Sequence, residues 1–177
     1  MTKAEIINAL RLSFSNFTKL CSSIDQNIFF DKPTAKWSVA ENVKHLAIAT
    51  NTSALAFTLP KFLVRWVGGK PNRGSSTYEE LVIKYKKKLE DGGTASGRFV
   101  PKPLPITITK EKMMDEWENA ASKFIVALEQ NRTEKDLDNY LVKHPLLGRI
   151  TLRELCYFTI FHTQHHQNSI AVKNAAQ

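Results

Sequence analysis

The chain has 177 residues, of which 42% are hydrophobic and 24% charged, and this balance is typical of one globular domain spanning residues 1–177. No stretch approaches the roughly 18 apolar residues of a membrane span, and Glu5 interrupts the start of the chain, which excludes the apolar core of a signal peptide. The lack of such segments, with two cysteines that form no CxxC motif, leads us to expect a cytoplasmic protein with no membrane partner. The net charge is +8, but basic residues are not interleaved with aromatic ones, so we expect no nucleic-acid partner.

The first two predicted helices each begin at a capping box. Thr2 with Glu5 opens a helix that runs to about Ile24, because apolar residues then recur at helical spacing. Ser38 with Glu41 opens a second helix, which runs to about residue 57. In this motif the hydroxyl and the carboxylate each accept a hydrogen bond from the backbone of the first turn.

A connection of about 50 residues follows the second helix and contains most of the glycines and prolines. Within it, Thr77 to Glu90 has the pattern of a short extra helix, and Leu104 to Ile108 could be a short extended segment. The lysines of the short helix (Lys84, Lys86, Lys87 and Lys88) predict a solvated face that could also attract anionic substrates. A connection this long allows the helices on either side of it to lie parallel, and it often covers a pocket.

The last two predicted long helices run from Thr109 to about residue 130 and from Thr151 to about Asn174. Thr151 with Glu154 forms a third capping box. Four helices of some 20 residues, each with an apolar stripe, predict an all-α four-helix bundle with a long connection between helices two and three. Cys21 and Cys156 lie at apolar positions without metal-ligand spacing, so we expect two free, buried thiols.

Three of the five histidines crowd into the last predicted helix, at His162, His165 and His166. At about 100° per residue, His162 and His166 fall on the apolar side of this helix and His165 at its edge. A single inward histidine is usually a hydrogen-bonded core residue. Two buried imidazoles at positions i and i+4 both need a partner, and one shared cation satisfies both.

His45 lies in the second predicted helix and is flanked by small residues, Ala49, Thr52 and Ala56, which leave room for a cavity. By itself it would be an ordinary histidine. Together with His162 and His166 it supplies a third nitrogen, and three histidines with an open position are the pattern of a catalytic rather than a structural zinc-type site.

Two segments, WSVAENVKHL at 37–46 and HPLLGRITLRELCYFTIFHTQHH at 144–166, resemble the DinB/YfiT-like superfamily of four-helix metal-binding proteins, in its DinB-like or DUF1569-type branches. The resemblance spans most of the chain, since the helix order and the long connection also fit. It implies a metal triad of His45, His162 and His166. In many relatives an arginine follows the histidine pair. Here the pair is followed by Gln167, Asn168 and Ser169, so no substrate anchoring by that arginine is carried over.

The resemblance implies a divalent metal, zinc or nickel, and a metal-dependent thiol (S-)transferase or hydrolase acting on a small molecule. A low-molecular-weight thiol is one implied cofactor, and a homodimer is compatible with the family. The hydrolase alternative needs a general base, for which Glu41 is the candidate, although its capping role already explains it. Gln167 and Asn168 could orient substrate, and His144 could order the chain before the last helix. The remaining alternative is a metal-binding bundle without turnover, with a stress-response or interaction role.

Overall fold

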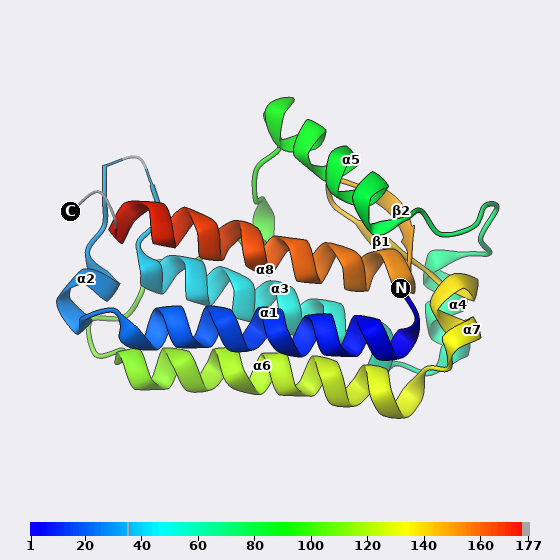
Figure 1. Ribbon diagram of the computed structural model, residues 1–177, viewed down its shortest axis with the longest axis horizontal. Coiled ribbons are helices and arrows are strands. Elements are labelled where there is room, and N and C mark those ends of the chain that lie inside the picture. Colours follow the sequence, from blue (N-terminus) through cyan, green and yellow to red (C-terminus); the bar gives the residue numbers. More distant parts are fainter. Residues whose placement is uncertain (35, 175–177) are drawn as a thin grey trace.

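The computed structural model describes residues 1–34 and 36–174, and this part of the chain is mainly α-helical (Figure 1). Its long helices are α1 (Lys3–Ser23), α3 (Val39–Thr58), α6 (Lys110–Asn131) and α8 (Leu152–Asn174). The shorter elements are α2 (Gln26–Phe30), α4 (Lys61–Gly68), α5 (Tyr78–Glu90), the 3-10 turn η1 (Gly97–Phe99), α7 (Glu134–Asn139), β1 (Leu141–His144) and β2 (Gly148–Thr151).

The four long helices lie side by side and form the predicted four-helix bundle (Figure 1). Helices α1 and α3 each pack against both α6 and α8. Helices α3 and α6 run in the same direction, opposite to α1 and α8, so the connection between α3 and α6 returns along the whole bundle (Figure 1). This connection carries α5, which lies over α8, and η1, which contacts α3. The parallel pair predicted from the length of the connection is therefore present.

Local hydrogen bonds explain where the helices begin. The three predicted capping boxes form, and two further ones start α5 and α7; the pairs are Thr2 with Glu5, Ser38 with Glu41, Thr77 with Glu80, Thr133 with Asp136, and Thr151 with Glu154. The core between α1, α3 and α6 is aromatic, with Trp117 packed edge-on against Phe14 and Phe17. Cys21 and Cys156 are buried free thiols, as expected.

The hairpin formed by β1 and β2 was not predicted. Its strands pair antiparallel from Leu141 opposite Thr151 to His144 opposite Gly148. Gly148 adopts a positive φ of 75°, which a glycine tolerates at a tight turn. Conversely, the segment Leu104–Ile108 is not a strand. The prolines at 103 and 105 have no N–H to donate to a ladder, which explains why this prediction fails.

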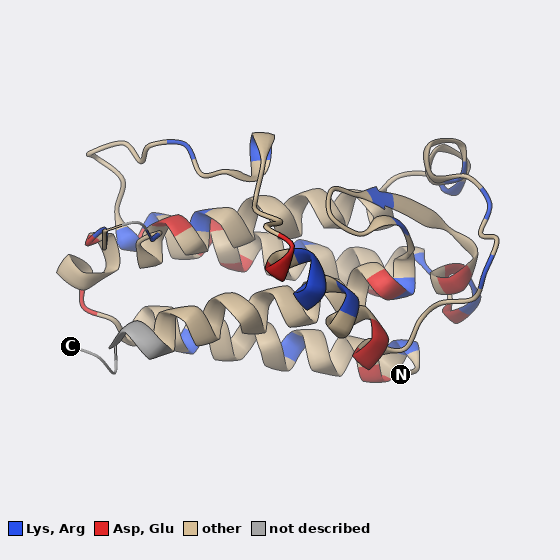
Figure 2. Cartoon of the chain, turned by 90° about the horizontal axis from the view of Figure 1, so that it is seen from above, with Lys and Arg blue, Asp and Glu red and all other residues tan. Residues whose placement is uncertain are grey.

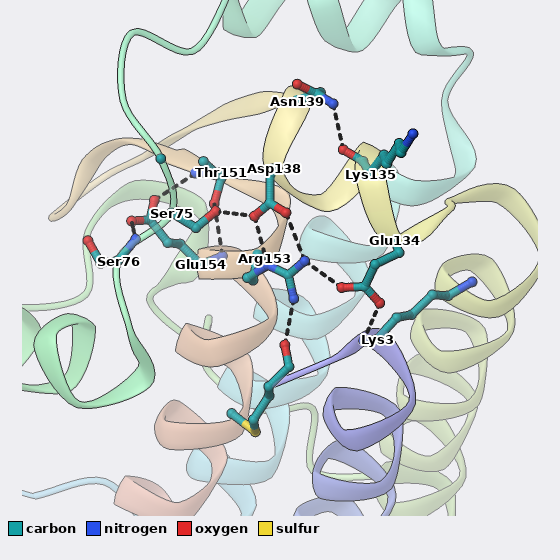
Figure 3. A network of polar contacts seen from close by, with 12 residues as sticks. Lys3, Ser75, Ser76, Glu134, Lys135, Asp138, Asn139, Thr151, Arg153 and Glu154 are labelled. Atoms are coloured by element: carbon teal, nitrogen blue, oxygen red, sulfur yellow. Dashed lines mark hydrogen bonds and ion pairs between the residues drawn. The ribbon is translucent and has the colours of Figure 1, made fainter.

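A buried carboxylate attaches the long connection to the start of α8. Glu154, whose side chain is fully buried, accepts hydrogen bonds from Arg73 at 2.6 and 3.0 Å and from the backbone N–H groups of Ser76 and Thr151, both at 2.8 Å. The adjoining network is centred on Arg153, which binds Asp138 and Glu134 (Figure 3). The hydrogen bonds and the Arg73 charge hold the pKa of Glu154 below its usual value against the opposing effect of burial.

We expect Glu154→Gln to destabilise the fold by about 2–4 kcal/mol, because the amide keeps the size but presents N–H donors to groups that are themselves donors. The free energy of unfolding in urea measures this. The matched control is Glu5→Gln, which changes the same motif at the exposed start of α1, where we expect a much smaller loss. Equal losses in both variants would contradict the role assigned to the buried carboxylate.

No helix in the two described ranges, 1–34 and 36–174, has both the length and the apolar character needed to cross a membrane.

Candidate metal centre

Three histidine side chains converge between α3 and α8. The Nε2 atom of His162 lies 3.0 Å from Nε2 of His45 and 3.1 Å from Nε2 of His166. All three rings are buried, and their ligand atoms lie within 4.8 Å of one another. His162 and His166 are one helical turn apart and point inward, while His165 is exposed, which is the orientation expected from the helical spacing.

Hydrogen bonds on the far side of two of these rings determine where their protons lie. Nδ1 of His45 is 2.7 Å from the carbonyl oxygen of Phe99, and because a carbonyl only accepts, Nδ1 is the donor. Nδ1 of His166 is 2.6 Å from Oδ1 of Asn42, whose amide Nδ2 donates to the carbonyl of Ser38 at 2.7 Å. In both neutral rings the Nε2 lone pair therefore faces His162.

This arrangement fits a divalent cation better than it fits a hydrogen-bonded histidine cluster. Nε2 of His162 carries at most one hydrogen, so it cannot satisfy two facing lone pairs with good geometry. A cation would satisfy all three nitrogens at once. Two nitrogens at about 2.1 Å from one ion stand roughly 3.0 to 3.4 Å apart for angles between 90° and tetrahedral, which includes the two spacings found here. The partners Phe99 and Asn42 would hold the rings in the ligating orientation.

The electrostatics of the site keep these histidines neutral. Burial, followed by the neighbouring His166 and His45, holds the pKa of His162 well below its usual value. Burial does the same for the pKa of His166. The pKa of His45 is also lowered by burial, partly offset by its bond to Phe99. Neutral imidazole is the form that binds a metal, so the lone pairs are available near neutral pH.

The triad opens into a cavity of about 450 Å³ that is covered by the long connection. Aromatic and aliphatic side chains form most of its walls, among them Trp37, Leu89, Phe99, Leu146 and Phe158. Lys36 and His165 are exposed basic residues among the lining. In the described part of the chain, no Asp or Glu lines this cavity. The site thus joins a neutral three-nitrogen cluster, apolar walls and a basic margin.

Glu41, the candidate base, does not line this cavity. One carboxylate oxygen accepts from the backbone N–H of Ser38 at 2.8 Å, and the other binds Lys32 at 2.7 Å. Glu41 lines a different hollow, beside Pro103 and Ile108. Its catalytic role stays a prediction, and its geometry favours capping.

The other sequence candidates divide between the cavity and the surface. His144 lines the cavity, and its Nδ1 accepts hydrogen bonds from the backbone N–H groups of Leu146 and Leu147, so it orders the hairpin turn before α8. Gln167 and Asn168 do not line the cavity. Asn168 is exposed and Gln167 half-buried.

Two residues that support the triad were not singled out from the sequence. Asn42 lies three residues before His45, so helical spacing alone could have placed it on the same side of α3. Phe99 contributes a backbone carbonyl from η1, and no side-chain pattern announces such a contact.

Comparisons with known proteins agree with this fold. A family model described as the DinB superfamily matches residues 9–170. None of the curated proteins matches the sequence. YfiT from Bacillus subtilis, described as a probable metal-dependent hydrolase with an unusual four-helix bundle topology, aligns with a TM-score of 0.57 at 14% identity over 98% of this chain and 87% of its own.

Two further solved structures share the fold at low identity. A variant of the mycothiol-dependent maleylpyruvate isomerase has a TM-score of 0.57 and 14% identity, covering 94% of this chain and 59% of its own. The colibactin self-resistance protein ClbS, solved in complex with a double-stranded DNA, has a TM-score of 0.56 and 17% identity, covering 98% of this chain and 96% of its own.

The ClbS complex corrects the expectation that nucleic acid is excluded as a partner. That expectation was wrong because it relied on the scarcity of aromatic residues among the lysines. A double-stranded DNA can be bound through its phosphates alone, which requires positive charge and no base stacking.

Proposed function

The chain belongs to the DinB superfamily, and on this premise we propose that it is a metal-dependent enzyme that transfers a low-molecular-weight thiol to a small molecule. The observation that carries the proposal is the convergence of three histidine Nε2 atoms on the wall of a largely apolar cavity. His45, His162 and His166 would hold a zinc or nickel ion. When bound, such an ion acts as a Lewis acid that lowers the pKa of a coordinating water or thiol.

The composition of the cavity supports thiol transfer over hydrolysis. A hydrolase needs a general base that takes a proton from water, yet no described Asp or Glu lines the cavity, and Glu41 is engaged elsewhere. A coordinating thiol gives up its proton without such a base. The exposed Lys36 at the margin of the cavity would attract the carboxylates that small cellular thiols carry.

The residues around the site perform three tasks in this proposal. Phe99 and Asn42 fix the two outer histidines in the tautomer that presents Nε2 to the cavity. Trp37 lies parallel to the ring of His166 at 6.2 Å and closes one side. Phe158 stacks on His162 at 4.8 Å and closes the other. Together these rings limit access of water, which strengthens electrostatic interactions inside the cavity.

The test loads the protein with zinc or nickel and offers glutathione, bacillithiol or mycothiol with the electrophile 1-chloro-2,4-dinitrobenzene. A parallel reaction contains p-nitrophenyl acetate and no thiol. We expect thiol-dependent turnover that His162→Ala abolishes. Ester hydrolysis that needs no thiol would overturn the transferase proposal in favour of a hydrolase. Full metal loading with turnover in neither reaction would support the non-catalytic bundle.

A second candidate function is binding of double-stranded DNA, as in the ClbS complex. The observation that favours it is the exposed lysine run of α5, seen as a basic stretch in Figure 2. DNA shift assays at two salt concentrations test it, because phosphate contacts give a steep loss of affinity with salt. Lys87→Glu with Lys88→Glu should remove the shift, and an unchanged shift would exclude this face.

A further inference from the structure

Tyr85 is a buried polar residue of the cavity for which neither the fold nor the triad provides a partner. It is 5% exposed, lies in α5 and lines the cavity. Its hydroxyl makes no hydrogen bond with any residue of the described ranges, although the ring packs edge-on against Phe158, Phe161 and His162. The hydroxyl oxygen is not itself sealed from solvent, so it reaches the open volume of the cavity, where an oxygen of a ligand can accept its hydrogen.

His144 brings a second donor to the same wall. Its Nδ1 accepts from two backbone N–H groups, those of Leu146 and Leu147, both at 3.2 Å. The neutral ring therefore carries its proton on Nε2. This Nε2–H has no hydrogen-bond partner among residues 1–34 and 36–174, and the ring lines the cavity. The backbone of the turn, rather than the ligand, thus fixes His144 as a donor.

The two donors flank one aromatic ring beside the triad. The His144 ring lies 4.2 Å from the ring of Phe158, and the Tyr85 ring lies 5.2 Å from it on an edge-on contact. Phe158 in turn stacks on His162 at 4.8 Å. Lys84 donates to the carbonyl of Leu147 at 3.3 Å and so joins α5, which carries Tyr85, to the turn that follows His144.

We propose that Tyr85 and His144 form a donor pair that binds an acceptor oxygen of the substrate, a carbonyl or carboxylate, while its planar apolar body lies against Phe158. The reaction of the bound compound rests on the proposed function, whereas the binding of its oxygen by Tyr85 and His144 does not. Two neutral donors beside the same aromatic ring of a cavity wall select for acceptor oxygens and against amines or hydrocarbons. The substrate class is therefore a small aromatic or unsaturated acyl compound.

The test measures binding of benzoate, with toluene as the probe that lacks the oxygens. Isothermal titration calorimetry on the zinc-loaded protein gives the dissociation constants. Tyr85→Phe and His144→Asn should each weaken benzoate binding about ten- to hundredfold, because each removes one hydrogen bond to a charged acceptor. The asparagine side chain keeps an oxygen that can accept from the backbone N–H groups of the turn, and it lacks the Nε2–H of the histidine ring. Toluene binding should not change in either variant.

The matched control is Tyr78→Phe in the same helix. The Tyr78 hydroxyl donates a hydrogen bond to Gln164, and Tyr78 does not line this cavity. Benzoate affinity in this variant should equal that of the parent. Equal affinity in the parent, Tyr85→Phe and His144→Asn would overturn the donor pair while leaving the metal proposal intact.

The metal-free protein separates the two proposals. If no zinc binds, the proposed function fails, and the donor pair is tested by the ¹⁵N signal of His144 Nε2 on addition of benzoate. A shift that Tyr85→Phe weakens supports the pair, and no shift overturns it.

Discussion

The substitution His162→Ala should remove the bound metal. Nε2 of His162 is the one ligand atom within about 3 Å of both others, at 3.0 and 3.1 Å, so its loss leaves two nitrogens without the group that links them. We expect the affinity for zinc or nickel to fall more than a hundredfold, because changes to residues that merely support a ligand already cost about 10- to 100-fold. Elemental analysis of untagged protein should change from near one ion per chain to near none.

The control for this result is His165→Ala, which removes an adjacent but exposed imidazole. It should keep the metal, whereas His166→Ala should lose it and His45→Ala should weaken binding. Asn42→Ala should fall in between, at about 10- to 100-fold weaker binding, because His166 then loses the acceptor for its Nδ1–H. Equal metal loss in His165→Ala would contradict the inward orientation of the pair, and full retention in His45→Ala would place the third ligand elsewhere.

The metal-free protein should lose stability steeply as the pH falls below about 6.5, the ordinary pKa of the histidines. Burial lowers the folded-state pKa of His162 and His166 well below that value and lowers that of His144 to about 4. In this range the unfolded chain binds protons that the folded chain cannot accept. The contribution of these histidines to the free energy of unfolding is therefore fully present above pH 6.5, and it is lost as the pH falls toward their folded-state pKa values.

Each such histidine contributes a slope of up to about 1.4 kcal/mol per pH unit, and the slopes of the buried histidines add. Urea unfolding of the metal-free protein at a series of pH values measures this slope. His144→Asn should reduce this slope, since one of the titrating groups is gone. A free energy of unfolding that stays constant from pH 7.5 to 5 would show that these histidines are not buried neutral.

Some features of the molecule were predicted wrongly from the sequence or were missed. The exclusion of nucleic acid was wrong because net charge and aromatic content describe a surface only on average. The hairpin β1–β2 was missed because its four-residue strands are too short for alternation to stand out, and their pairing depends on Pro145 and Gly148 closing a turn beneath α5. Tyr85 lies within the lysine run of α5, and nothing in that run indicates that its side chain lines the cavity.

Features that depend on neighbours along the chain were determined by the sequence itself. Capping boxes, helix lengths and the inward pair His162 and His166 all follow from hydrogen bonds or spacing within two turns of one helix. The tertiary structure alone decided which side chains and backbone groups meet across helices. It brought His45 to His162, and the Phe99 carbonyl to His45. It also placed His144 and Tyr85 against the ring of Phe158, and it paired Glu41 with Lys32. Such contacts depend on how packed helices cross and on the path of a 50-residue connection, and neither is encoded in local spacing.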